Sequence, residues 1–308
     1  MPKRSTFFTL SGSLVLLAGL AFSQQADSLA KRIGHYDPKT YPTREGIHDG
    51  AGSMAYGNLV DVKYVQGNWV FFQRGVLNPH SSIGEHFHLA TEEMFVIFDG
   101  DAQFTVDGRT AVVRAPAAVP VRLGHEHAVY NPTDRPMQWM NVSVSVKKGV
   151  SGAFNMGDTR VDAALDAIPQ FISMRFDRAL LKPVDRMNGG TGAVQYRRAL
   201  QPSMFSTSWA YVDHLLLNPG ASAGPASQAD ISEIYYVMKG AGSVTVDRET
   251  ASIKEGDGIP VDMGQTRSFT QSGPEPLEML VVGVARDMTV KGNMGDSVRT
   301  GEAPKVAR

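Results

Sequence analysis

The sequence predicts an all-β protein that contains two copies of one sandwich or barrel domain. Three observations support this prediction. Short β-favouring runs alternate with frequent turns, in line with 31 Gly and 17 Pro among 308 residues. Identical residues recur at a constant offset of 140 positions. Helical periodicity is weak, and its best candidate lies near residues 160–165.

The composition excludes several classes of function. Lys and Arg total 30 and Asp and Glu total 31, so the net charge is −1. Because no basic surplus is present to neutralise phosphates, we expect no nucleic-acid partner. The chain has no cysteine, which excludes disulfides, thiolate metal ligands and a cysteine nucleophile.

The N-terminus has the pattern of an export signal. Lys3 and Arg4 precede an apolar run over residues 7–22, and Ala21-Phe22-Ser23 offers small residues at the two positions that a signal peptidase reads. The alternative is an uncleaved membrane anchor, but the run is short for the roughly 20 apolar residues of a span. We therefore predict a signal peptide over residues 1–23, a periplasmic or extracellular location, and no membrane span after cleavage.

The internal repeat divides the chain. Over residues 77–131 and 217–271, one ungapped offset gives 15 identities in 55 pairs, among them Gly84/Gly224 and Glu93/Glu233. We predict an N-terminal arm at 24–65, a first domain at 66–150, a connector with early strands of the second copy at 151–200, a second domain at 201–290, and a tail at 291–308.

Each copy contains short runs that favour strands. Residues 69–72, 94–98 and 102–106 are rich in aromatic and β-branched side chains, and residues 234–238 and 243–246 repeat the pattern in the second copy. Asp107-Gly108 is a hairpin signal, and Gly100 and Gly124 mark further turns.

The first copy concentrates metal-ligating side chains. His86 and His88 are two apart on a strand and share a face, whereas Glu93 needs a bend over residues 89–91 to join them. His127 or His125, which should share a face because they are two apart, would come from a separate strand. Three imidazoles and a carboxylate suit one divalent transition metal, namely Mn, Fe, Co, Ni, Cu or Zn.

Glu92 competes with Glu93 as the acidic ligand. The repeat decides between them, because position 233 is Glu whereas position 232 is Ser.

These residues resemble the cupin family. His86-x-His88, four residues, Glu93, six residues and Gly100 match the core of its first motif, while Gly124, two residues, His127, three residues and Asn131 match the core of its second. Gly84 and Pro120 depart slightly from the expected flanking spacing. The resemblance implies a bicupin of two jelly-roll barrels (double-stranded β-helices), favours His127 over His125, and assigns the metal ligands to His86, His88, Glu93 and His127.

The second copy lacks this ligand set. At the same offset His86, His88 and His127 become Ala226, Gln228 and Arg267, and only Glu93 keeps its equivalent, Glu233. We expect Arg267 to pair with Glu233 in place of the metal, because a buried carboxylate needs a partner. The alternative is that this pair forms an anion or sugar pocket with Tyr235 or Tyr236.

The expected pocket of the first copy surrounds Glu93. Phe95 and Ile97 should share the inward face of Glu93, with Met94 and Phe98 facing away. Other candidate pocket residues are Trp139, Asn141, Asn131, Gln103, Arg74, His80 and His125, although single polar residues in strands more often lie at the surface.

The expected partner is a small-molecule ligand or substrate, and three classes of function remain open for the protein. Cupin resemblance suggests a dioxygenase, isomerase, lyase or decarboxylase, with Glu93 as a base that could detach from the metal. The alternatives are a non-catalytic sugar- or small-ligand-binding protein and a metal-braced structural protein. The resemblance also suggests a homodimer through barrel edges.

Overall fold

The computed structural model describes residues 27–295. The predicted signal peptide at 1–23 and most of the predicted tail lie outside the described residues. Within them, no helix is long and apolar enough to cross a membrane.

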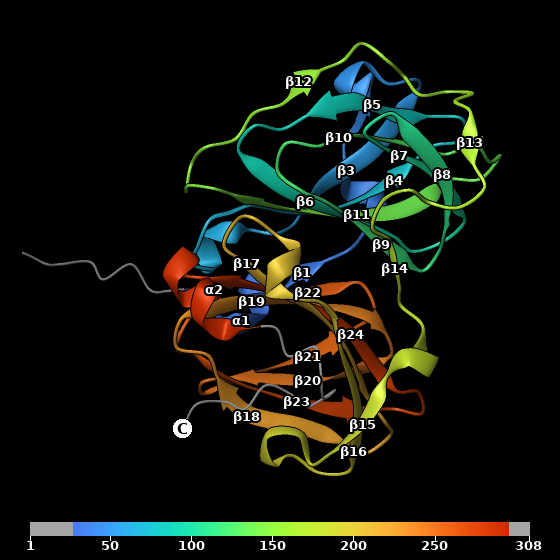
Figure 1. The fold of residues 1–308 in the computed structure, drawn as a ribbon. Helices are drawn as coiled ribbons and strands as arrows, with labels where there is room; N and C mark the ends of the chain where they lie inside the picture. The colour runs from blue at the N-terminus through green and yellow to red at the C-terminus, as the bar shows by residue number, and fades with distance from the viewer. Residues whose placement is uncertain (1–26, 296–308) are drawn as a thin grey trace, which may run out of the picture.

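The first copy is built almost entirely from strands (Figure 1). A short helix, α1 (Leu29–Arg32), precedes it. Its strands are β1 (Gly34–His35), β2 (Thr43–Glu45), β3 (Ser53–Val60), β4 (Trp69–Leu77), β5 (Ser82–Phe87), β6 (Thr91–Ile97), β7 (Asp101–Val106), β8 (Arg109–Arg114), β9 (Ala117–Val121), β10 (Glu126–Tyr130) and β11 (Met137–Ser145). The connector adds β12 (Phe154–Asn155) and β13 (Leu165–Asp166) to the first barrel.

The second copy repeats this order. Its strands are β14 (Met174–Arg175), β15 (Lys182–Asp185), β16 (Ala193–Leu200), β17 (Trp209–Leu217), β18 (Ser222–Ser227), β19 (Ile231–Lys239), β20 (Ala241–Val246), β21 (Glu249–Lys254), β22 (Asp257–Val261), β23 (Thr266–Ser272) and β24 (Leu277–Ala285), followed by helix α2 (Met288–Met294). From β1 and β14 onward, equivalent strands begin 140 residues apart, with β2 and β15 differing by one residue.

Each copy folds into a large and a small sheet that face each other. In the first copy the large sheet has the order β14-β9-β6-β11-β4-β3-β2, and the small one β12-β5-β10-β7-β8-β13. In the second copy the orders are β1-β22-β19-β24-β17-β16-β15 and β18-β23-β20-β21. The apolar faces of each pair enclose a separate core, around Phe95 and Phe104 in the first copy and around Tyr235 and Phe269 in the second.

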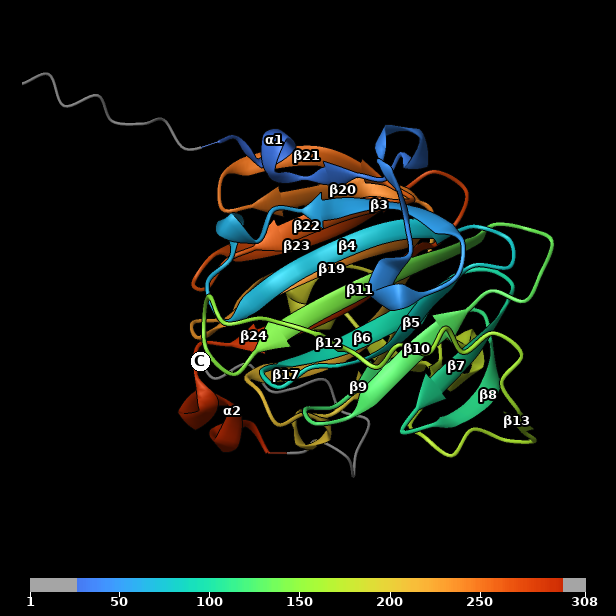
Figure 2. The same ribbon diagram turned by 90° about the horizontal axis from the view of Figure 1, so that it is seen from above.

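The two copies are joined back to back through their large sheets (Figures 1 and 2). A third apolar core lies between these sheets and includes Phe72, Met94 and Val142 from the first and Ile234 and Val282 from the second. Met94 therefore faces away from the barrel interior, as the strand alternation predicts.

The copies also exchange their first strands. Strand β1 pairs with β22 of the second copy, with Gly34 opposite Gly258, and β14 pairs with β9 of the first copy, with Met174 opposite Ala118. Because both pairs of positions differ by 140, the exchange is reciprocal. It ties the two barrels together through backbone hydrogen bonds as well as apolar packing.

Three sequence expectations need correction. Residues 160–165 do not form a helix: Arg160 and Asp162 have positive φ angles, and Leu165 begins strand β13. The predicted arm at 24–65 contains β2 and β3, which belong to the large sheet of the first barrel, so that barrel begins earlier than residue 66. Helix α2 spans the predicted start of the C-terminal tail at 291.

Candidate metal centre

Three strands bring the predicted ligands to one point in the first barrel. His86 lies on β5, His88 directly follows it, and His127 lies on the neighbouring strand β10, paired with His86. Residues 88–90 form the bend that takes the chain from the small sheet to β6 of the large sheet, where Glu93 points back toward the imidazoles. One ligand atom from each of the four side chains lies within 4.8 Å of all the others.

Hydrogen bonds orient two of the imidazoles. Nδ1 of His86 lies 2.8 Å from the carbonyl oxygen of Gly84, and Nδ1 of His88 lies 2.9 Å from that of Gly152. A carbonyl only accepts, so both Nδ1 atoms carry the proton and both Nε2 atoms keep a free lone pair. Such backbone contacts are the usual way in which proteins fix the tautomer of a metal-binding histidine.

The cluster contains buried polar atoms that no protein group satisfies. Nε2 of His88 and both ring nitrogens of His127 are buried without a hydrogen-bond partner. Nε2 of His127 lies 3.5 Å and Nε2 of His88 3.4 Å from the carboxylate of Glu93, which also accepts a 2.7 Å hydrogen bond from Asn141. Buried polar groups are normally paired, so the donor set and its unpaired nitrogens fit a divalent transition metal.

The surroundings keep His86, His127 and Glu93 in their ligating protonation states. Burial lowers the pKa of His86 and of His127, which favours the neutral imidazole. Burial alone would raise the pKa of Glu93, but the contacts with His127, His88 and Asn141 outweigh it and lower that pKa.

A further histidine, His48, extends the cluster. Its ring stacks on that of His86, with centroids 3.7 Å apart and planes inclined by 5°. Nδ1 of His48 lies 2.8 Å from Oδ1 of Asn155, which is on β12. His48 lies in the short turn over Ile47–Asp49 with φ 51°, and both this turn and β12 come from outside the predicted first domain.

A cavity of about 280 Å³ opens onto the cluster. Its lining includes His48, His86, His88, Glu93, Phe95, Trp139, Asn141, Met54, Tyr56, Phe71, Gln73, Thr91, Ser143 and Gly152. The lining includes three residues that the sequence predicted to face the pocket, namely Phe95, Trp139 and Asn141. No lysine or arginine lines it among the residues that the structure describes.

Other predicted pocket residues lie elsewhere. Ile97 faces inward but packs in the apolar core beyond the cavity. Gln103 does not line the cavity, because its neighbours Ala102 and Phe104 take the inward positions on β7. Arg74 is buried between the copies and donates to Tyr236 and to the carbonyl of Trp139.

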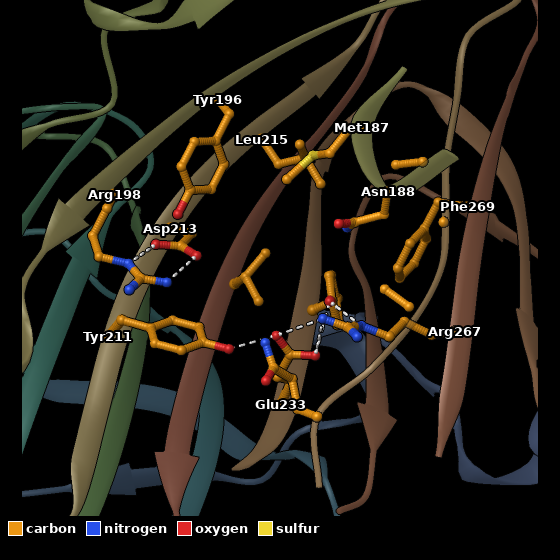
Figure 3. Close-up of a pocket in the computed structure, with 16 residues that line it drawn as sticks. Met187, Asn188, Tyr196, Arg198, Tyr211, Asp213, Leu215, Glu233, Arg267 and Phe269 are labelled. Atoms are coloured by element: carbon orange, nitrogen blue, oxygen red, sulfur yellow. Dashed lines mark hydrogen bonds and ion pairs between the residues drawn. The ribbon is translucent and has the colours of Figure 1, made fainter. Parts of the chain in front are cut away.

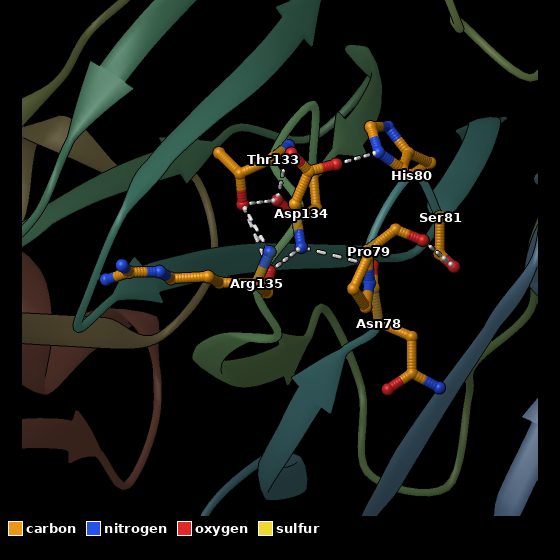
Figure 4. A network of polar contacts seen from close by, with 8 residues as sticks. Asn78, Pro79, His80, Ser81, Thr133, Asp134 and Arg135 are labelled. Carbon is orange, nitrogen blue, oxygen red and sulfur yellow. Dashed lines mark hydrogen bonds and ion pairs between the residues drawn. The ribbon is translucent and has the colours of Figure 1, made fainter.

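Asn131 and His80 do not line the cavity. Figure 4 shows His80 pointing toward Asp134 of the neighbouring loop. The amide of Asn131 donates to the carbonyls of Leu77, Asn78 and Arg135, so this residue ties the loops together instead of facing a ligand. His80 pairs with Asp134 at the surface.

The structure also separates the competing ligand candidates. His125 lies before β10 begins, so it does not share the face of His127; it contacts Asp107 at 2.6 Å and its side chain is 41% exposed. Glu92 points away from the cluster and accepts hydrogen bonds from the backbone of Leu123, Ser206 and Thr207.

In the second copy an ion pair stands in the equivalent place (Figure 3). Nη2 of Arg267 lies 2.9 Å from Glu233, and Ala226 is paired with Arg267 as His86 is with His127. Tyr211 and Tyr235 donate to the two oxygens of Glu233 at 2.7 and 3.0 Å. Burial raises the pKa of both tyrosines, so they remain hydrogen-bond donors. Tyr236 faces the other way, toward Arg74.

Comparison with known proteins agrees with this architecture. The family described as "Cupin domain" matches the chain twice, at residues 73–143 and 214–283. The chain is a bicupin of the cupin superfamily. An oxalate-binding protein of Thermotoga maritima is 29% identical over 99 residues, which are 32% of this bicupin and 82% of that protein.

Solved structures share the fold at low sequence identity. Oxalate decarboxylase of Lactobacillus farciminis, in a formate complex, aligns with a TM-score of 0.59 and 14% identity over 82% of this bicupin and 86% of that chain. The coconut allergen cocosin aligns with a TM-score of 0.60 and 12% identity over 83% and 86%. An enzyme and an allergen thus match equally well, so the fold alone does not decide the function.

Sequence reasoning missed His48 and Gly152. A signal for His48 was present, because the offset of 140 continues upstream through Gly50/Gly190, Gly52/Gly192 and Tyr56/Tyr196. Extending the repeat would have placed His48 inside the first domain. Gly152 contributes only a backbone carbonyl, for which no sequence pattern exists.

Proposed function

We propose that this bicupin is an exported enzyme that depends on one divalent transition metal, held by His86, His88, Glu93 and His127. The observation that carries the proposal is the convergence of four donor atoms beside a cavity in the first barrel, with three buried nitrogens of His88 and His127 left unpaired. The positive start and apolar run of residues 1–22 support export.

A metal bound there would polarise an oxygen ligand and lower the pKa of bound water or of a chelating hydroxyl group. The carbonyls of Gly84 and Gly152 accept hydrogen bonds that orient His86 and His88. Asn141 donates a hydrogen bond to one oxygen of Glu93. If Glu93 tilts away from the metal, its carboxylate can accept a proton from a substrate in the cavity.

The cavity favours a small hydroxylated or carboxylated compound with an apolar body. Phe71, Phe95 and Trp139 supply aromatic walls, whereas Gln73, Thr91 and Ser143 supply neutral polar groups. Since no lysine or arginine among the described residues lines the cavity, the positive charge for an oxygen ligand would come from the metal site, formally +1 with a divalent ion.

We propose dioxygenase chemistry first and isomerase or lyase chemistry second, and the aromatic lining of the cavity supports this order. A substrate as small and polar as oxalate would leave the aromatic walls uncovered.

Non-catalytic binding is the alternative function. The relative named as an oxalate-binding protein supports it. The two candidates differ in turnover, so substrate consumption separates them.

The first test compares wild type with His88→Ala and with His125→Ala as a matched control. We expect one metal equivalent per chain by elemental analysis, lost in His88→Ala and kept in His125→Ala, because His125 lies outside the cluster. Oxygen consumption with hydroxylated aromatic or carboxylated compounds should follow the metal. Two equivalents per chain would contradict the assignment of a single site, and binding without turnover would favour the alternative.

A further inference from the structure

We propose that the second barrel contains a separate binding site for a small carboxylate, at the position where the first barrel has its histidine cluster. The site is lined by Tyr196, Arg198, Asp213, Glu233 and Arg267 (Figure 3). It does not depend on the metal-dependent function proposed above.

The lining of this pocket is charged and buried. Arg198 pairs with Asp213 at 2.9 Å, and these side chains are 6% and 9% exposed. Arg267 pairs with Glu233 at 2.9 Å, and these are 9% and 5% exposed. Tyr211 lies between the two pairs: its ring faces the guanidinium of Arg198 and its hydroxyl donates to Glu233.

All four carboxylate oxygens of these pairs already accept hydrogen bonds. Those of Asp213 accept from Nε and Nη2 of Arg198. Those of Glu233 accept from Tyr211, Tyr235 and Arg267. Each of these carboxylate oxygens is therefore already engaged by a donor of the protein.

The groups that remain unpaired are donors. Nη1 of Arg267 is buried and has no hydrogen-bond partner, and the residue as a whole is only 8% exposed. The hydroxyl of Tyr196, a residue 4% exposed, has no partner in full hydrogen-bond geometry and lies beside the carboxylate of Asp213. A buried donor without a partner is costly, and most so when it is charged, so Nη1 of Arg267 calls for an acceptor that carries negative charge.

The size of the pocket limits the ligand to a few non-hydrogen atoms. The cavity is about 60 Å³, much smaller than the cavity of the first copy. Ala226 has no side chain beyond Cβ and leaves space where the first copy has His86. Gln228 and Asn188 add amides to the wall.

Ion pairs with only a structural role would not need to be buried around a cavity. Apolar residues of similar volume commonly replace buried ion pairs at no loss of stability. At the equivalent positions the first copy has Asn58 and Gln73 in place of Arg198 and Asp213. The second copy has added a further pair of buried charges around its cavity, as a recognition site for a charged ligand would need.

The experiment is calorimetric titration of the full-length protein with acetate, after removal of metal, with acetamide as the neutral isostere. Metal removal prevents acetate from binding at the first site, and His88→Ala serves as a second metal-free sample. We expect one acetate per chain with a Kd below about 1 mM, and no binding of acetamide.

Three variants locate the site. Tyr196→Phe removes one donor and should weaken acetate binding about tenfold. Arg267→Lys keeps the charge but removes the second Nη donor, and should weaken binding at least as much. Ala226→Leu fills the cavity and should abolish binding, while Arg248→Lys, an exposed arginine of the same domain, should leave it unchanged.

Circular dichroism and thermal unfolding check that each variant folds. If Arg267→Lys does not fold, Tyr196→Phe still tests the site. Absence of saturable binding, equal binding of acetamide, or binding that the three variants do not change would overturn the proposal. Binding seen only in the metal-loaded protein would assign the carboxylate to the first site instead.

Discussion

The two barrels of this bicupin surround the same buried carboxylate with opposite chemistry. Glu93 faces three imidazoles, two of which have a buried nitrogen without a partner. Glu233 faces a guanidinium and two tyrosine hydroxyls, and both of its oxygens are satisfied. Both barrels have a carboxylate at this position, and its neighbours decide whether the site fits a metal or balances the charge with a protein cation.

Aromatic positions change together with the ligands. Phe71 and Phe95 of the first copy correspond to Tyr211 and Tyr235 of the second. Both tyrosine hydroxyls donate to Glu233, so the copy without the histidines has other donors for its carboxylate. The backs of the two barrels share one apolar layer between the copies.

The largest expected effect comes from removing the protein cation of the second copy. Arg267→Met leaves Glu233 buried without its charged partner, and should lower the free energy of unfolding by about 3–5 kcal/mol. Urea unfolding followed by circular dichroism measures this loss.

Adding Glu233→Gln to Arg267→Met should recover much of that stability, since the uncompensated charge is then gone. The exposed-site control Arg248→Met should change stability little. If Arg267→Met alone were as stable as wild type, the ion pair would not be what balances Glu233.

A smaller effect on stability is expected from a charged residue that only the second copy has at the interface between the barrels. Glu278 contacts His214 at 2.7 Å and Arg178 at 2.6 Å, whereas the equivalent of Glu278 in the first copy is the neutral Gln138. Burial would raise the pKa of Glu278, but these contacts outweigh it and lower the pKa below its ordinary value.

The unfolded chain therefore takes up this proton at a higher pH than the folded chain. The stabilisation from Glu278 is present above its ordinary pKa of about 4.5 and is lost as the pH falls through that value and below it. Glu278→Gln should destabilise the protein by about 1–2 kcal/mol at pH 7, with a smaller penalty at pH 4. Urea unfolding at pH 7, 5 and 4 tests this, and an equal penalty at all three values would contradict it.

The sequence predicted the fold and the cluster because both depend on local spacing. Two histidines at i and i+2, a bend and a carboxylate can be read within ten residues, and the repeat doubles the evidence for each strand. Strand alternation also placed Phe95 and Met94 on the correct faces. None of this needs knowledge of how the barrels meet.

The predictions that failed concern how far the cavity extends into the barrel and which distant segments of the chain contact each other. Alternation puts Ile97 inside the barrel but does not say that the cavity ends before it. His125 appeared to share the face of His127 because the start of β10 at Glu126 was unknown. The strand exchange and the contact of Gly152 with His88 join segments whose meeting is decided by tertiary packing.

The smallest effect concerns His48, whose equivalent in the second copy is Asn188. His48→Asn gives the first copy the residue of the second and removes the ring that stacks on His86. Because groups around a metal site orient its ligands without bonding to the ion, we expect the metal to remain but with about tenfold weaker affinity, the low end of such losses. Competition with a chelator measures the affinity, and Asn188→His serves as the control that should add no second metal. An unchanged affinity would mean that the carbonyl of Gly84 alone orients His86, and that the N-terminal turn closes the cavity without acting on the ligands.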